Sequence, residues 1–294
     1  MTRSRHARVV GLALLGLLGL APSRARAHHV AGHGSSEGVR SINSLGNRGG
    51  TAQTRLMLLS EFSHAGAGLV PGQRYELSLL GEYAPVPGLS LGAQLPVTIL
   101  GEQPRGGVAS VRSGYGDTRA FVRFTPHASK LIHRTLTFAL WASFPTRTLR
   151  STVDPGRLWL VTPSAIFTRT YARLYWQVIG LASVEQRPAG VALDLSAGEQ
   201  VGARMLDGKI SAGVGVLVDV RAVNACRDPA GALQTCATRA GEIDRAIGTT
   251  RATALANFSW TMDASWSLSL SLQLPYTPSR DFDVGASLGL SAVF

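Results

Sequence analysis

The stretch Ala264–Phe294 constrains the fold more than any other part of the sequence. From Trp266 to Tyr276, large apolar residues alternate with small polar ones, and a second alternating segment runs from Phe282 to Phe294 after a short turn. A period of two predicts β-strands. One face is rich in leucine with aromatic residues at its ends, and the other face is mainly serine, glycine and glutamine. This pattern is typical of strands with one face in lipid and the other in a wet lumen.

The same alternation begins near Thr51 and continues along the chain. Ten further strands are predicted before the final hairpin, and their connections are mostly short after the even-numbered strands and longer after strands one, three, five and nine. An even strand count places both chain ends in the periplasm, with long loops outside. The sequence therefore predicts an all-β fold, a 12-stranded antiparallel transmembrane outer-membrane β-barrel over residues 51–294. The first ten strands are expected at Ala52–Phe62, Gln73–Tyr83, Leu89–Leu100, Tyr115–Phe124, Thr135–Phe144, Arg157–Thr168, Arg173–Val184, Val191–Arg204, Lys209–Arg221 and Thr249–Trp260.

A soluble sandwich or a lipocalin-like module is the alternative, with the apolar face as its packed core. Two features favour the membrane barrel. The polar face has few lysines and glutamates for a face in bulk water, and aromatic residues gather at strand ends, as an interfacial girdle requires. The girdle residues are Tyr75, Tyr83, Trp260, Trp266, Tyr276, Phe282 and Phe294. In a closed barrel the last strand must also pair with the first, so that no edge is left in lipid.

The first 27 residues have the features of a secretory signal peptide. Basic residues precede an apolar run from Val9 to Ala21, which is too short to cross a bilayer as a helix, and Ala25-Arg26-Ala27 is a cleavage site. An uncleaved anchor is the alternative. Residues 28–50 are rich in histidine, glycine and serine and lack strand periodicity. They are expected to form a flexible periplasmic segment or a short plug.

Charged residues fall on the predicted lumen face in nearly equal numbers of each sign. We expect them to pair into ladders that brace the barrel rather than to form an ion filter. Asp117, Arg119, Phe121 and Arg123 share one face of the fourth predicted strand and are the candidate lining of a constriction. The other charged lumen positions are Arg55, Arg74, Arg221, Arg251, Glu61, Glu76, Glu82, Asp194, Asp219 and Asp283.

The fourth predicted strand opens on Gly114-Tyr115-Gly116-Asp117-Thr118, which resembles the G-x-G-D element of outer-membrane transporters of the meta-pathway of phenol degradation (MetA-pathway) family. The leader, a strand containing Pro96 and the aromatic C-terminus agree with this resemblance. It implies a small barrel that passes hydrophobic or aromatic compounds. A structural turn is the other interpretation of Gly116-Asp117. The final Phe294 is similar to the ends of outer-membrane barrels generally, which implies a recognition signal for the barrel-insertion machinery.

Two small residue sets remain. Cys226 and Cys236 lie in a polar segment from Asn224 to Arg245, and in an oxidising compartment they are expected to form a disulfide across a short loop. If the leader is cut after Ala27, the new N-terminal amine of His28, with His29 and His33, could chelate Cu(II) or Ni(II). A flexible polar tail without metal is the alternative.

The sequence indicates no enzyme, because no G-x-S-x-G or H-E-x-x-H motif occurs and the histidines fall outside the predicted strands. The net charge of +11 is scattered and falls when the leader is removed, so nucleic acid is not an expected partner. We therefore predict an outer-membrane channel or transporter for small hydrophobic or aromatic molecules in a Gram-negative bacterium, without cofactors. Its expected partners are outer-membrane lipid, the insertion machinery and a small-molecule substrate. A non-conducting structural or metal-binding barrel is the alternative.

Overall fold

The computed structural model describes residues 52–65, 72–102, 110–129, 134–148, 159–187, 190–227, 232–235, 247–277 and 283–294. The predicted signal peptide and the segment 28–50, with His28, His29 and His33, lie outside these residues. All regular structure within them is β-strand. No helix in the described part of the chain is long and apolar enough to span a membrane.

The strands follow the predicted alternation closely, and most extend it by a few residues. The bounds are β1 Arg55–Ala65, β2 Gly72–Val86, β3 Leu89–Glu102, β4 Ser110–Tyr115, β5 Arg119–Ser129, β6 Arg134–Ser143, β7 Trp159–Tyr171, β8 Leu174–Arg187, β9 Gly190–Met205, β10 Ile210–Arg227, β11 Leu233–Thr235, β12 Thr250–Thr261, β13 Trp266–Pro275 and β14 Val284–Val293.

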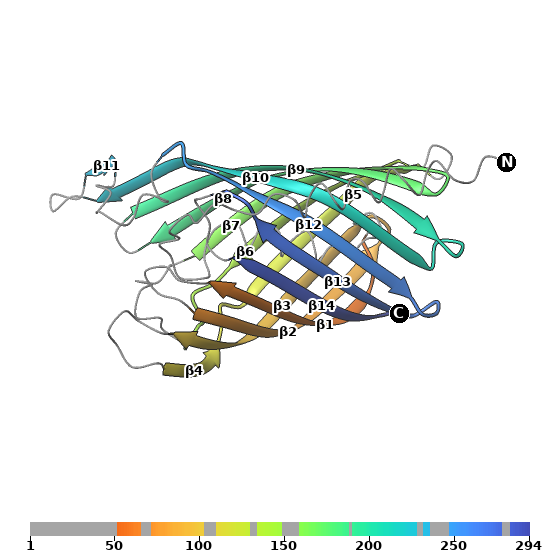
Figure 1. Ribbon diagram of the computed structural model, residues 1–294, viewed down its shortest axis with the longest axis horizontal. Helices are drawn as coiled ribbons and strands as arrows, with labels where there is room; N and C mark the ends of the chain where they lie inside the picture. The colour runs from red at the N-terminus through yellow and green to blue at the C-terminus, as the bar shows by residue number, and fades with distance from the viewer. Residues whose placement is uncertain are drawn as a thin grey trace.

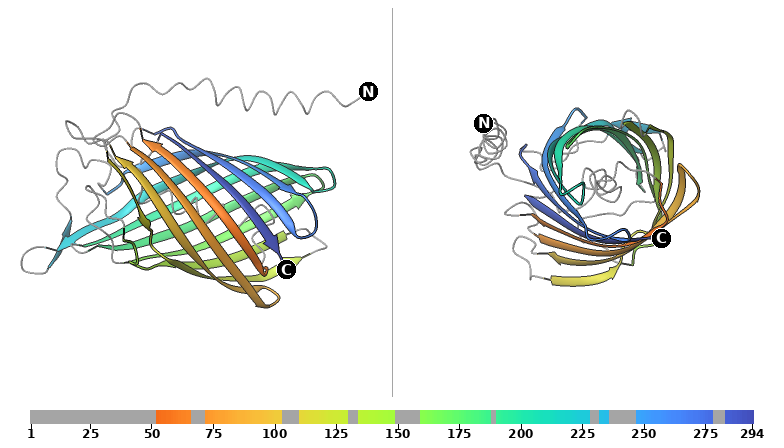
Figure 2. Two further views of the ribbon diagram at one scale, coloured as in Figure 1. Left: turned by 90° about the horizontal axis from the view of Figure 1, so that it is seen from below. Right: turned by 90° about the vertical axis from the view of Figure 1, so that its right-hand side faces the viewer.

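The sheet closes on itself, as the sequence predicted. β14 pairs antiparallel with β1 from Arg55 opposite Val293 to His64 opposite Val284. Twelve strands form the wall, because β4 and β5 both pair with β3 as two parts of one barrel strand and β11 adds only to the end of β10. Figure 2 shows the closed ring in its right-hand view, and Figure 1 shows the strands inclined to the barrel axis with β11 at one end.

The wall is interrupted between β4 and β5, where a continuous strand was predicted. Val97 of β3 pairs with Tyr115, whereas Gln94 pairs with Arg119, so two residues of β3 oppose three of the neighbouring strand. This is a β-bulge. Pro96 lies opposite it, near the middle of β3. A proline donates no ladder hydrogen bond, so it is tolerated where the adjacent ladder is already broken.

A tight turn at Asp207-Gly208 joins β9 to β10. Leu206, Asp207 and Gly208 have φ of 50°, 55° and 84°, and the Gly208 amide donates to Met205 at 3.1 Å. Positive φ at successive residues matches the twist of a tight hairpin, and glycine adopts it without strain.

The outer surface of the barrel is apolar. The predicted girdle residues of the described chain are all exposed, from 44% for Trp266 to 82% for Phe294, while Phe282 lies outside the described residues. Inward residues are instead buried and largely polar. In a soluble sheet the apolar face is buried and the polar face is exposed. Here the apolar face is exposed and the polar face is buried, as a membrane barrel requires.

Candidate functional site

The barrel lumen gathers the polar side chains of the wall. On β2, Arg74, Glu76 and Ser78 are at most 8% exposed, whereas the intervening Tyr75 and Leu77 are half exposed on the outer surface. Successive side chains of a strand point to opposite faces. The same alternation on the other strands therefore gives the barrel a polar inner surface and an apolar outer surface. The charged residues predicted for the lumen are buried there, with Asp283 partly so.

The structure brings the four predicted constriction residues to one place. Asp117 precedes β5 and Arg119, Phe121 and Arg123 follow it on the inward face, each 6% exposed or less. Three of the four side chains are engaged by ion pairs with other elements, and the aromatic one packs on the wall. Whether they narrow a conducting path stays a prediction.

One ion-pair network centres on Glu82 of β2. Arg55 Nε donates to Glu82 Oε2 at 2.7 Å, and Arg123 Nη1 lies 3.1 Å from Glu82 Oε1. Ser90 of β3 adds a hydrogen bond of 2.6 Å to the same carboxylate. Arg123 reaches across β3 to this carboxylate, so the network ties β1, β2, β3 and β5 together. Paired and buried, these charges brace the wall.

A second network centres on Glu76, further along β2. Arg74 Nη2 donates to Glu76 Oε2, and Arg119 Nη1 lies 3.1 Å from Glu76 Oε1. A third lies on the opposite wall, where Arg221 of β10 makes a bidentate contact with Asp194 of β9 and Arg251 of β12 lies 3.6 Å from it. The ladders expected from the near balance of lumen charges are therefore present.

Phe121 lies flat against the wall instead of projecting across the lumen. A Cβ added at Gly92 of β3 would meet Phe121 Cζ at 2.2 Å, so the ring occupies the space that this glycine leaves. Trp141 of β6 stacks on Phe121 with centroids 4.3 Å apart and planes at 29°, and Arg123 lies 5.5 Å from the Phe121 centroid. An aromatic surface beside guanidinium groups can bind planar apolar molecules.

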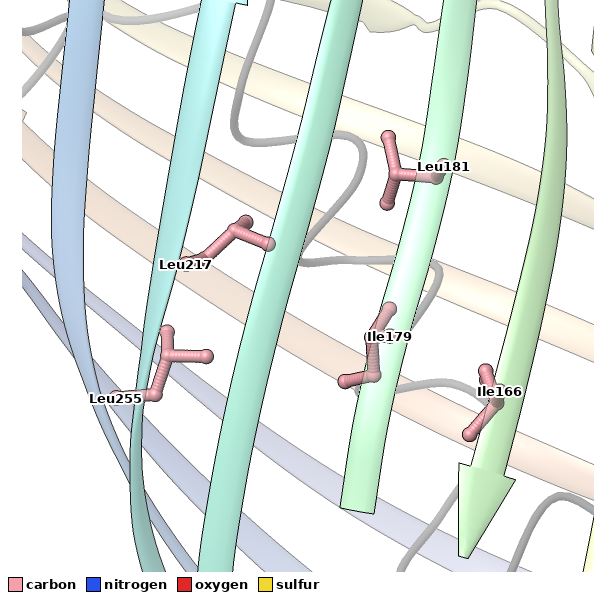
Figure 3. Packing of buried hydrophobic residues seen from close by; sticks show 5 residues of the cluster. All are labelled: Ile166, Ile179, Leu181, Leu217 and Leu255. Atoms are coloured by element: carbon pink, nitrogen blue, oxygen red, sulfur yellow. The ribbon is translucent and has the colours of Figure 1, made fainter.

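Two apolar clusters on the lumen face were not predicted. One comes from β7, β8, β10 and β12, and Figure 3 shows its side chains projecting from neighbouring strands. The other includes the aromatic pair and comes from β1, β2, β5 and β6. The order of strands around the barrel places the two clusters on opposite walls. The first consists of Ile166, Ile179, Leu181, Leu217 and Leu255, and the second of Met57, Leu80, Phe121, Ala139 and Trp141.

The signal for the first cluster was present but ambiguous. Both faces of the strand predicted at Arg157–Thr168 were mixed, because Ile166 faces the lumen while Phe167 faces outward. Next to the cluster, Gln200 Nε2 donates to Tyr175 Oη at 2.8 Å, and Asn257 Nδ2 donates to Gln200 Oε1 at 3.0 Å. The lumen thus alternates between apolar patches and hydrogen-bonded polar networks.

The Gly114–Thr118 motif lies inside the wall rather than at the opening of a strand. Gly116 sits at the bulge, where an added Cβ would meet Pro96 Cγ at 3.0 Å, and its amide donates to the Pro96 carbonyl at 2.9 Å. Asp117 Oδ1 accepts the amide of Arg147 at 3.2 Å and lies 4.0 Å from Arg147 Nε. These contacts give the motif a structural role at the bulge, and a substrate contact by Asp117 stays a prediction.

The described parts of the cysteine segment are largely β-strand. Cys226 belongs to β10, and Ala225 to Arg227 pair with β11, so that Cys226 lies opposite Gln234. Cys236 lies outside the described residues, and the disulfide stays a prediction. In the described part of the chain, no group of three or more His, Cys, Asp or Glu residues could hold a metal ion.

No protein-family profile matches the chain, and no curated protein matches it in sequence. Its fold matches a COG4313 outer membrane channel from Pseudomonas putida F1 at a TM-score of 0.59 and 14% identity, covering 83% of this chain and 96% of that one. The β domain of the Bordetella autotransporter BrkA matches at 0.51 and 11% identity, covering 83% and 100%. The transport unit of the Escherichia coli autotransporter AIDA-I matches at 0.50 and 8% identity, covering 88% and 97%.

These similarities confirm the predicted fold. With its closed wall and apolar exterior, the protein is a bacterial outer-membrane β-barrel. None of the three bears the name of the meta-pathway family, so that resemblance stays a prediction.

Proposed function

We propose that this barrel is an outer-membrane channel or transporter for small hydrophobic or aromatic molecules. The observation that carries the proposal is the apolar lining of the lumen, which comprises an aliphatic cluster on one wall and the Phe121–Trp141 stack on the opposite wall. Lumens of barrels that pass ions and sugars are polar. Here many of the lumen charges pair with one another, and we expect the two apolar clusters, rather than these charges, to select the solute. The similarity to an outer membrane channel supports the same role.

The test is uptake of an apolar aromatic probe, N-phenyl-1-naphthylamine, which fluoresces when it passes the outer membrane and enters phospholipid. Cells producing the full chain are expected to take up the probe several-fold faster than cells with an empty vector. Ile179→Thr places a hydroxyl in the aliphatic cluster and should reduce this gain. Val178→Thr is the matched control, because Val178 is the preceding residue on the outer face and is 37% exposed.

Planar-bilayer recordings on pure refolded protein separate the channel from a non-conducting barrel. An open-state current together with probe uptake supports the proposal. Absence of both would overturn it in favour of the non-conducting alternative. Uptake that is equally reduced by Ile179→Thr and Val178→Thr would refute selection by the aliphatic cluster.

A further inference from the structure

One carboxylate of this barrel points outward, toward lipid. Glu199 lies on β9 between the outward-facing Ala197 and Val201, and its side chain is exposed. Among the described residues, its hydrogen-bond partner is Trp176 of β8, whose Nε1 donates to Glu199 Oε1 at 2.6 Å. Among the described outward residues more than three positions from a strand end, Glu199 is the only charged one.

Its depth makes this position unusual. Glu199 is six residues from Met205, the end of β9 near the girdle residue Trp260, and eight from Val191 near the other end. At about 3.3 Å per residue and a strand tilt near 40°, these separations correspond to about 15 Å and about 20 Å along the barrel axis. The apolar band of such a barrel is only about 25 Å tall, so Glu199 lies near its middle. Charged side chains at this depth are costly when they face lipid and usually face protein instead.

The outer surface around Glu199 differs from the rest of the barrel in a second way. One rung toward Val191, the residues in register across β7, β8 and β9 are small, and a valine follows on β10. On the opposite half of the barrel, a rung across five strands consists of leucine alone. The small rung is Ala165, Gly180 and Ala197, followed by Val218, and the leucine rung is Leu268, Leu290, Leu58, Leu79 and Leu95. Small residues allow protein surfaces to approach closely in a membrane, where apolar burial alone does not favour contact.

We infer that the outer face of β7–β12 around Glu199 is an interface with a second copy of this chain. A two-fold axis brings the same surface of both copies together. Glu199 of one copy would then lie beside the carboxyl and indole groups of the other copy at the same depth in the membrane. A carboxyl group is self-complementary, since an acid and a carboxylate share a proton. The outer face of β7–β12 is about 20 Å wide and about 25 Å tall, from strand spacing and band height. Two copies would therefore bury about 1,000 Å² in total, which is near the minimum expected of a biological interface.

Photocrosslinking in intact cells tests the location of the interface. A p-benzoylphenylalanine probe replaces Leu195 on β9, two rungs from Glu199, or Leu79 on the leucine rung. These leucines are 47% and 45% exposed, so the two probes are matched in residue type and accessibility. We expect a homodimer crosslink from the Leu195 position and none from Leu79. No homodimer from Leu195, equal crosslinking at both sites, or a crosslink to a different protein would overturn the inference.

A second measurement tests the role of Glu199 itself. The full chain is reconstituted in nanodiscs wide enough for two barrels, and the copies per disc are counted by native mass spectrometry. Glu199→Leu should weaken self-association at least tenfold while the barrel stays folded, because the variant places leucine where lipid would otherwise meet a carboxylate. Glu199→Gln keeps an acceptor for Trp176 and should weaken self-association less than Glu199→Leu does. A wild-type protein that stays monomeric, or a Glu199→Leu variant that associates like the wild type, would contradict the inference.

Discussion

Glu82→Gln tests whether the ion pairs of the lumen stabilise the barrel. The substitution keeps the size of the side chain but removes its charge, leaving the Arg55 and Arg123 guanidinium groups facing a neutral amide. In the wild type the Glu82 side chain is 0% exposed, and those of Arg55 and Arg123 are 7% and 1% exposed. Burial this complete limits screening by water. Breaking a buried pair costs about 3–5 kcal/mol, and the amide still accepts hydrogen bonds, so we expect a loss of about 3 kcal/mol.

The free energy of unfolding is measured by urea titration of the barrel in lipid vesicles, followed by tryptophan fluorescence. Arg147→Gln is the control, because its contact with Asp117 is 4.0 Å long and the Arg147 side chain is 15% exposed. A contact of this length is too long for a hydrogen bond, so it should contribute less than the pairs of Glu82. If Glu82→Gln changes the free energy by less than about 1 kcal/mol, or by no more than Arg147→Gln, the bracing role is wrong.

Three further predictions concern packing, insertion and the cysteines. Gly92→Ala should cost about 1–3 kcal/mol in the same titration, since the new Cβ would meet the Phe121 ring at 2.2 Å and the Gly81 carbonyl at 2.6 Å, whereas Gly81→Ala meets nothing within 4 Å and should be tolerated; equal effects would refute the packing argument. Phe294→Ala should leave the unfolding free energy nearly unchanged, because the residue is 82% exposed, but should lower the heat-modifiable, inserted fraction in cells several-fold; full insertion would contradict the signal role. Without reductant, Cys226 and Cys236 should resist maleimide, and the Cys226→Ser/Cys236→Ser variant should lose up to about 2–3 kcal/mol by loop entropy; maleimide labelling of the untreated protein would exclude the disulfide.

The strands and the closure of the barrel could be predicted because they depend on a simple physical pattern. Alternation with a period of two fixes both the strand and the face of each residue, and hydrocarbon forbids an unpaired edge. The lumen position of Arg119, Phe121 and Arg123 follows from the same rule. Their partners do not, because Arg123 reaches Glu82 across β3, and only the register of three strands brings those two groups together.

The bulge and the apolar lumen escaped prediction for a different reason. At Gly116-Asp117 the chain continues in the same direction after a one-residue change in register, and alternation alone cannot distinguish this from a turn before a strand. Ile166 and Phe167 are consecutive residues of β7, so an apolar residue occupies each face of the strand there. The sequence then shows no alternation of apolar and polar residues from which the inward face could be predicted. Glu199 was not singled out from the sequence, although the lumen position of Asp194 on the same strand puts Glu199 on the outer face by alternation. Its neighbours in register show that it faces outward.

The two halves of the barrel therefore fix their register by different means. Slipping a strand by one residue in the β1–β5 half would expose buried charges such as Glu76 to lipid and bury leucines, a large penalty. In the β7–β12 half, Ile179 faces inward and Gly180 faces outward, so hydrophobic contrast opposes a slip only weakly. Specific lumen pairs must hold the register there, and the bidentate Asp194–Arg221 contact and the Tyr175–Gln200 hydrogen bond each join adjacent strands of that half. On the outer face of this half, Glu199 and the small residues Gly180 and Ala197 replace the leucines of the other half, which is the property expected of a surface covered by protein.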